Sequence, residues 1–328
     1  MWNIHGLGDS RSRNSRRGSR LRSLNFMLLA LLAFVSSARA QQQLNLPVIN
    51  SMKDVPVTDT LRETNNGKTH VLNAPGASPS RQAGQPEEEE FIKPSRPTVA
   101  APAEIQKAGV LQIQYGYDAN FRGRDLHTEQ SGPLALRFAA ASRLLLELDL
   151  DTFKSKTDAT TRLTETGIGD ARLGLQFVAL KDTTEHPAVA FAYYLKLPAA
   201  SVEKELGTGR YDHKLVFLLS KKVGAVDLDF NAAYLNFGRE DGEGRESGGQ
   251  AAFSFSRGFE NNFGLVGELS GQSLDEAQPR GIYALTALTY RVNRRLQLDG
   301  GLRFGLTPAA PRVGVFAGMT VGVADFFR

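Results

Sequence analysis

The stretch from Arg143 to Phe153 reads R-L-L-L-E-L-D-L-D-T-F, and its apolar and charged residues alternate. Leucine occupies every even position from 144 to 150, and Leu145 alone departs from the alternation. The odd positions carry the charged side chains of Arg143, Glu147, Asp149 and Asp151. Successive residues of a strand point to opposite faces, whereas a helix would spread the leucines around its whole circumference. The stretch therefore predicts a strand with one apolar face, for a protein core or lipid, and one charged face that needs water or partners.

The basic charge of the chain is confined to its first forty residues. The chain has 328 residues and a formal net charge of +4. Seven arginines and Asp9 give residues 1–40 a charge of +6, so the remaining residues sum to −2. The rest of the chain is therefore not basic, and no nucleic-acid partner is predicted. The chain has no cysteine, which excludes disulfides, thiolate metal sites and a thiol nucleophile.

Residues 1–40 have the features of a secretory signal peptide. An arginine-rich start precedes an apolar run from Leu24 to Val35, and Ser36-Ser37-Ala38-Arg39-Ala40 follows. A basic region, a short apolar region and a small-residue site in this order predict export and cleavage after Ala40. A retained membrane anchor is disfavoured, because the apolar run is shorter than a spanning helix needs.

Residues 41–108 show neither a helical nor a strand period. Glutamine and proline recur, glutamate fills positions 87–90, and the stretch from Pro94 to Pro102 reads P-S-R-P-T-V-A-A-P. Prolines at this density disfavour both a helix and a central strand. The composition predicts a disordered segment in the periplasm, which would act as a spacer or bind a periplasmic partner.

From Gly109 to Arg328 the sequence consists of alternating segments. We count about twelve of about nine to thirteen residues each, the length that a tilted membrane strand needs. They cover residues 110–119, 133–141, 143–153, 169–180, 187–198, 210–221, 225–237, 249–257, 262–271, 281–291, 295–305 and 312–323. No apolar run reaches the roughly twenty residues of a membrane helix. Residues 109–328 are therefore predicted to be all-β, as a transmembrane antiparallel up-and-down β-barrel.

The connections between these segments alternate in length. The long ones include 120–132, 154–168, 199–209 and 238–248, and the short ones include 222–224, 258–261 and 292–294. Outer-membrane barrels have short periplasmic turns and long external loops. The pattern therefore predicts a Gram-negative outer-membrane protein whose two barrel ends lie on the periplasmic side. Its expected partners are outer-membrane lipid and the barrel-insertion machinery.

The polar face of the alternating segments predicts the lining of a lumen. Its charged candidates are Arg137, Glu147, Asp149, Asp170, Arg172, Lys196, Lys214, Asp227, Asp229, Glu268, Asp299 and Arg303. Aromatic residues lie mainly near the segment ends, where a membrane girdle is expected: Tyr115, Tyr117, Phe153, Tyr193, Tyr211, Tyr234, Phe237 and Phe263. Because the lining carries both signs of charge, strong ion selectivity is not predicted.

Three motifs in the same order resemble a known family. They are Thr166-Gly167-Ile168-Gly169-Asp170 at a strand entry, Lys196-Leu197-Pro198 at a strand end, and the loop Gly207-Thr208-Gly209-Arg210-Tyr211-Asp212. Over roughly residues 110–328 the sequence is similar to the outer-membrane family named for the meta-pathway of phenol degradation. The resemblance implies a barrel that transports small solutes, aromatic or hydrophobic ones included, and does not imply an enzyme of phenol breakdown. The chain departs from such barrels, which usually end in Phe, because it ends Phe326-Phe327-Arg328.

The first of these motifs also has a structural interpretation. Its glycines would accommodate a close approach of the backbone, and Asp170 could accept hydrogen bonds from backbone amides at the strand mouth, or pair with Arg172 or a lumen cation of the next strand. A contact between Asp170 and a solute is the alternative. Gly207-Thr208-Gly209 lacks the lysine, the serine or threonine and the helix of a phosphate-binding loop.

Catalytic and metal sites are not predicted. The histidines of the domain are His127 in a long connection, His186 in a short one, and His213, whose position in its strand points it outward near the rim. Neither a nucleophile motif nor a spacing of metal ligands accompanies them. No organic cofactor is predicted either.

The sequence leaves three functions open. The first is a passive channel for small solutes, because twelve strands stand between small barrels filled by side chains and large open porins. The second is a non-conducting barrel that acts through residues 41–108. The third and least favoured is an outer-membrane hydrolase that depends on His213.

Overall fold

A computed structural model of the chain describes residues 90–123, 126–239, 243–275 and 279–327, so the predicted signal peptide and most of the predicted disordered segment lie outside the described residues. The described residues form strands β1 (Val110–Phe121), β2 (Leu126–Ala141), β3 (Leu144–Asp158), β4 (Thr164–Gly167), β5 (Ala171–Leu180), β6 (Ala188–Leu197), β7 (Asp212–Val223), β8 (Val226–Gly238), β9 (Arg245–Gly258), β10 (Phe263–Gln272), β11 (Gly281–Asn293), β12 (Leu296–Gly305) and β13 (Val313–Asp325), with a short 3-10 turn, η1 (Glu260–Asn262). Within these ranges no helix is long and apolar enough to cross a membrane.

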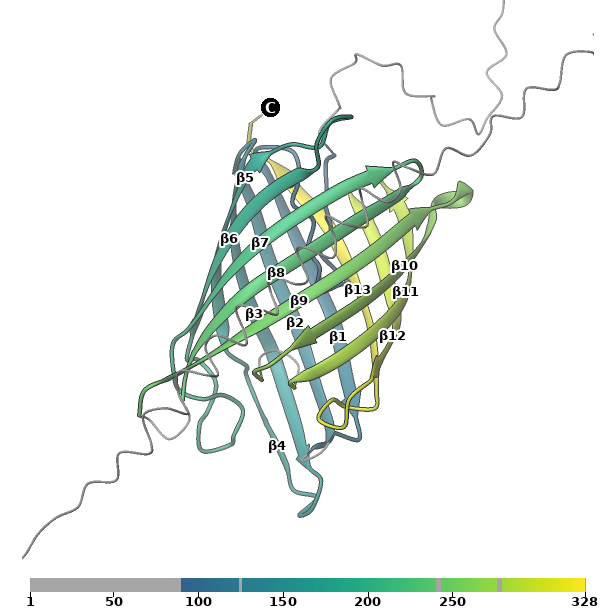
Figure 1. Cartoon of the computed structure of the whole chain (residues 1–328). Coiled ribbons are helices and arrows are strands. Elements are labelled where there is room, and N and C mark those ends of the chain that lie inside the picture. The colour runs from purple at the N-terminus through teal and green to yellow at the C-terminus, as the bar shows by residue number, and fades with distance from the viewer. Residues whose placement is uncertain (1–89, 124–125, 240–242, 276–278, 328) are drawn as a thin grey trace, which may run out of the picture. The chain divides into compact units, whose positions relative to one another are not determined.

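The strands close into a barrel. Each strand pairs antiparallel with its neighbours in the order of the chain, and β1 completes the ring by pairing with both β2 and β13. Closure gives every strand except the short β4 a partner on both sides, which a sheet in lipid requires. β4 and β5 both pair with β3 and are two parts of one interrupted strand (Figure 1). With these two counted as one, the barrel has the twelve strands that the sequence predicts.

The interruption between β4 and β5 lies at the glycine-aspartate motif. The amide of Gly169 donates to the carbonyl of Asp151 at 2.9 Å, and a side chain at Gly169 would overlap Asp151. One carboxylate oxygen of Asp170 accepts hydrogen bonds from the amides of Ala199 and Ala200, both at 3.0 Å. The motif thus ends one strand, starts the next and ties this point to the connection after β6.

The two rims of the barrel differ. At the short-turn rim, tight turns join β2 to β3 and β7 to β8, and Gly224 adopts a positive φ of 62°. Val110 pairs with Asp325 at this rim, so both ends of the barrel lie on one side, as predicted. At the other rim several strands continue beyond the predicted ends, because β2 begins at Leu126 and β9 at Arg245. These extensions carry polar residues on both faces, so alternation of hydropathy could not reveal them.

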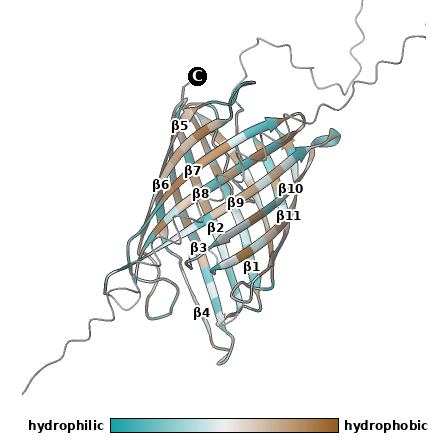
Figure 2. Ribbon diagram, viewed as in Figure 1, coloured by the Kyte–Doolittle hydropathy of each residue, from teal (hydrophilic) through white to brown (hydrophobic). Residues whose placement is uncertain are grey.

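The outer wall is apolar across its middle, as the brown bands on β5 to β8 show (Figure 2). Leu173, Phe177, Phe191, Leu215 and Leu269 are among its exposed side chains. Phe237, predicted in the outer girdle, instead faces inward with 8% of its surface exposed. It shares the parity of Leu235 and Ala233, which belong to a buried cluster inside the barrel.

Residues 90–108 differ from the predicted disordered segment. They have defined positions inside the barrel, and Ile92, Ala100 and Ala103 have at most 1% of their surface exposed. We call these residues the inner segment. The sequence pattern missed it because a segment without strand or helix period can still be ordered when side chains of a surrounding wall bind its backbone.

Candidate functional site

The inner segment enters and leaves the barrel at the short-turn rim. Its ends meet there, where the amide of Lys107 donates to the carbonyl of Glu90 at 2.8 Å. The rim holds both ends by ion pairs, Glu90 with Arg291 at 3.6 Å and Lys107 with Asp325 at 2.6 Å. The segment therefore fills the lumen as a loop inserted from one end.

Polar side chains of the wall satisfy the backbone of the inner segment. Amide hydrogens bind to Gln112 on β1 from Lys93 (2.8 Å), to Glu268 on β10 from Ala100 (2.8 Å) and to Ser220 on β7 from Ala103 (2.7 Å). Carbonyl oxygens accept from Arg137 on β2 (Lys93, 2.8 Å) and from Gln176 on β5 (Pro102, 3.1 Å, and Ala103, 3.0 Å). Prolines 94, 97 and 102 have no amide hydrogen, so the segment could not be held as an additional strand.

Glycines on the inner wall make room for two large side chains of the inner segment. A Cβ atom on Gly116 would lie 2.6 Å from Arg96 Cζ, and one on Gly318 would lie 2.6 Å from Arg96 Nε. A side chain at Gly322 would overlap the ring of Phe91. The guanidinium of Arg96 pairs at 3.3 Å with Asp299, whose side chain is 1% exposed. The barrel wall is therefore shaped to receive this segment.

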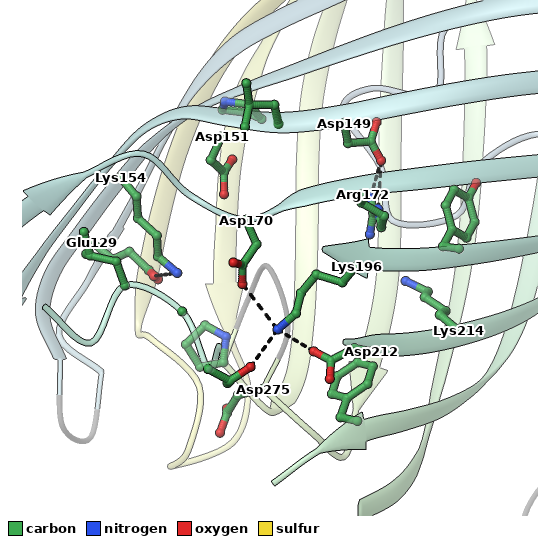
Figure 3. A pocket seen from close by; sticks show the side chains of 18 of the residues that line it. Glu129, Asp149, Asp151, Lys154, Asp170, Arg172, Lys196, Asp212, Lys214 and Asp275 are labelled. Atoms are coloured by element: carbon green, nitrogen blue, oxygen red, sulfur yellow. Dashed lines mark hydrogen bonds and ion pairs between the residues drawn. The ribbon is translucent and has the colours of Figure 1, made fainter. Parts of the chain in front are cut away.

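The far end of the lumen, beyond the tip of the inner segment, is open. A cavity of about 780 Å³ reaches from Ser95, Arg96 and Thr98 toward the long-loop rim. Charged side chains of β3, β5, β6 and β7 point into it, as Figure 3 shows for Asp149, Arg172, Lys196, Asp212 and Lys214. We call this space the vestibule.

The charges of the vestibule form one row across four strands. The registers place Asp149, Arg172, Lys196 and Asp212 side by side. Arg172 contacts Asp149 at 2.7 Å, and the amino group of Lys196 contacts Asp212 at 2.5 Å and Asp170 at 3.3 Å. The row thus has two cations at its centre, each paired with a carboxylate at its own end, and all four residues line the cavity.

An aromatic ring borders this row. The guanidinium of Arg172 lies over Tyr194, 5.0 Å from the ring centroid, in the geometry of a cation–π contact. Gly174 on β5 leaves space for this ring, because a Cβ atom at position 174 would lie 2.6 Å from it. An aromatic ring therefore lines the vestibule beside a paired arginine and a paired lysine.

The structure divides the twelve predicted lining residues into three groups. Glu147, Asp149, Asp170, Arg172, Lys196 and Lys214 line the vestibule. Three others, Arg137, Glu268 and Asp299, contact the inner segment. The last three bind other side chains of the barrel: Asp227 pairs with Lys222 at 3.6 Å, Asp229 accepts a hydrogen bond from Ser220 at 2.5 Å, and Arg303 pairs with Asp118 at 3.1 Å. Whether any of them constricts a pore stays a prediction. The glycines at 116, 318 and 322 were missed, although glycine at alternating inward positions was visible in the sequence.

Histidines of the described ranges do not assemble a catalytic site. The Nδ1 atom of His213 contacts the hydroxyl of Tyr193 at 2.6 Å, and that of His186 lies 3.3 Å from the carbonyl of Pro187. Within those ranges, no histidine ring is in contact with a serine or a carboxylate, and no group of three potential ligands could hold a metal ion. The hydrolase interpretation gains no support from this geometry.

Comparison with known proteins identifies the family. The family model described as "Putative MetA-pathway of phenol degradation" matches residues 95–322, which include most of the inner segment. The chain belongs to this family. The predicted resemblance is thereby confirmed. None of the curated proteins compared with the sequence matches it significantly.

Solved structures share the barrel fold. The COG4313 outer membrane channel from Pseudomonas putida F1 is 16% identical with a TM-score of 0.51, over 67% of this chain and 97% of the channel. The CymD monoaromatic hydrocarbon channel (10% identity, TM-score 0.36, 66% and 89% covered) and outer membrane phospholipase A from Escherichia coli (14%, 0.39, 73% and 97%) are more distant. A shared fold does not determine function, so function must be argued from the lumen.

Proposed function

We propose that this outer-membrane barrel is a passive channel for small polar solutes, opened when the inner segment shifts. The observation that carries the proposal is the divided lumen, with an open charged vestibule that ends at the tip of an inserted loop. A loop bound mainly by hydrogen bonds and ion pairs can exchange these contacts for water, which costs far less than unpacking an apolar core.

The lining favours particular solutes. Side chains of both charges and the Tyr194 ring line the vestibule, so compact polar or zwitterionic molecules fit better than hydrocarbons. The cavity of about 780 Å³ is large enough for a molecule of a few hundred daltons. Because acids and bases are both present, transport of ions should be only weakly selective.

A reversible lock tests the proposal. The hydroxyl of Ser95 on the inner segment lies 3.1 Å from Gln114 Oε1 on β1, and the chain has no cysteine of its own. A cysteine at 114 is shorter than glutamine, so the full chain carrying S95C and Q114C is treated with a short bis-thiosulfonate cross-linker, which joins the two thiols through disulfides and ties the segment to the wall until it is reduced. The control is T157C with T164C, which joins β3 to β4 at hydroxyls 2.9 Å apart, outside the lumen.

We expect cross-linked S95C/Q114C to show no openings in planar bilayers, and reduction to restore the openings of the wild type. The control pair should conduct equally in its cross-linked and reduced states. Openings that persist in fully cross-linked S95C/Q114C would show that solutes pass without movement of the inner segment.

The second candidate function is a non-conducting barrel, and the filled half of the lumen is the observation in its favour. It predicts that neither the wild type nor the reduced lock conducts ions or admits solutes into liposomes, although both are folded. That outcome would replace the channel proposal.

A further inference from the structure

A polar cluster lies on the outer wall near the long-loop rim. It consists of Tyr193 on β6, His213 on β7, Tyr234 and Asn236 on β8, and Arg245 and Ser247 on β9. The registers place His213 opposite Asn236 and Asn236 opposite Ser247, so three polar residues form a row across neighbouring strands. We call the six residues the outer belt.

The outer belt marks the end of the apolar band. The lower row of the belt on β6, β7 and β8 contains Tyr193 and Tyr234, and between them lies Leu215, the register partner of both, which is 56% exposed. At the upper edge of the belt, Arg245 pairs with Gly238, and the connection between β8 and β9 begins there. A membrane that covers the apolar band therefore has its headgroup layer at the outer belt.

Hydrogen bonds fix the side chains of the belt in place. Tyr193 contacts His213 at 2.6 Å, and the hydroxyl of Tyr234 contacts Ser247 at 2.8 Å. The guanidinium of Arg245 donates to the side chain and carbonyl of Asn236 and, at 3.1 Å, to the carbonyl of Tyr211. A cation is thus held against the wall at headgroup level, although its side chain is exposed to the surroundings.

We propose that the outer belt binds the phosphorylated sugar headgroup of a glycolipid in the outer leaflet. The fixed guanidinium is complementary to a phosphate, which arginine binds through charge-assisted hydrogen bonds. Hydroxyl, amide and imidazole groups in one row offer donors and acceptors to sugar hydroxyls, and two tyrosine rings offer flat apolar surface between them. The inference rests on the outer-membrane location in the proposed function and on the orientation predicted from the connection lengths, with the long loops outside the cell.

The opposite end of the same strand provides a matched control. Arg257 near the end of β9 has the same parity as Arg245 and is also exposed. Its guanidinium lies over Phe259, 5.4 Å from the ring centroid, at the short-turn rim. Substitution of either arginine removes one exposed cation from the outer wall, but at opposite faces of the membrane.

The test is lipid binding to the full chain in detergent, measured by native mass spectrometry. The probes are bis-phosphorylated lipid A, its dephosphorylated form and phosphatidylglycerol. We expect R245A to bind lipid A at least about tenfold more weakly than the wild type, the magnitude of one lost charge-assisted contact. N236L should weaken binding in the same direction, and R257A should bind like the wild type.

Three results would overturn the proposal. They are equal affinity of R245A and wild type for lipid A, equal affinity of the wild type for lipid A and phosphatidylglycerol, and loss of lipid A binding in R257A alone. Heat-modifiable mobility in gels must show that every variant is folded. Channel conductance of R245A should equal that of the wild type, so failure of this proposal and failure of the channel proposal can be told apart.

Discussion

The two halves of the lumen are built from the same alternating strands but are lined by different chemistry. Where the inner segment lies, the wall offers neutral amides and hydroxyls such as Gln112, Gln176 and Ser220, and its charged groups Arg137, Glu268 and Asp299 bind the segment itself. In the vestibule it offers ionised groups such as Asp149, Arg172 and Lys196. An amide can both donate to and accept from a backbone, whereas charged groups on neighbouring strands pair with each other and stay hydrated. The two halves therefore differ in what their polar residues bind: the inner segment in the filled half, and side chains of neighbouring strands in the vestibule.

Loss of Arg96 should have the largest effect on the difference between the filled and the open half of the lumen. R96A leaves Asp299 buried without its partner, which costs about 3–5 kcal/mol in comparable buried pairs. We expect the inner segment to leave the lumen for a large fraction of the time, raising open probability in planar bilayers at least about tenfold. The double variant R96A/D299N should be closer to the wild type than R96A, because no buried charge is left unpaired. An unchanged open probability in R96A would contradict the role of this pair.

Gly116→Ala should act in the same direction with a smaller effect. The new Cβ would lie 2.6 Å from Arg96 Cζ, and the end of a flexible side chain can move to relieve the overlap. We expect open probability to rise by a few fold, consistent with overpacking of about 1–3 kcal/mol. Gly258→Ala is the matched control, because nothing lies within 4 Å of a Cβ at that position. Equal effects of the two substitutions would show that space at Gly116 does not help to hold the inner segment in the lumen.

Substitutions in the vestibule should change the ion selectivity of the channel and not its open probability. Lys196 stands between Asp170 and Asp212, so K196Q removes one positive charge and leaves two carboxylates facing the cavity. We expect the reversal potential in a salt gradient to shift toward cation selectivity, with little change in open probability. K204Q, in the exposed connection after β6, serves as the control. A shift in open probability without one in selectivity would argue that Lys196 only supports the wall.

The smallest effect is expected outside both halves, at Asp158 in the β3–β4 hairpin. Hydrogen bonds from the backbone of Thr161 and Thr160 and from the Thr161 hydroxyl lower the pKa of Asp158. A lowered folded-state pKa adds stability above the unfolded value, and this contribution disappears as the pH falls through the folded value. D158A should therefore melt slightly below the wild type at neutral pH and equally at pH about 2. A difference that persists at the low pH would point to lost packing instead.

Much of the barrel could be predicted from the sequence. Alternation such as that of Arg143 to Phe153, and the parity of connection lengths, suffice for strand number, for the direction of each face and for the common rim of the two ends. Both signals reflect lipid on one face of every strand, which is a local property of each segment. The interpretation of Asp170 as an acceptor for backbone amides also agrees with the structure.

The inner segment could not be predicted in this way. Its order comes from contacts with residues far away in sequence, such as Ala100 with Glu268 and Arg96 with Asp299. Periodicity reports only on neighbours along one strand, so a proline-rich stretch held by a surrounding wall looks the same as a disordered one. The division of the lining residues into two halves depends on the same long-range contacts.

The loop geometry of the inner segment has a mechanical consequence. Because residue 90 lies at the rim where the segment also leaves, a pull on the preceding chain would load the contacts one after another, beginning with Glu90 and Lys93. Bonds loaded in series break at lower force than the same bonds sheared together. A modest tension from the short-turn side would thus peel the segment away while the ring of strand pairings, loaded across many parallel hydrogen bonds, stays intact.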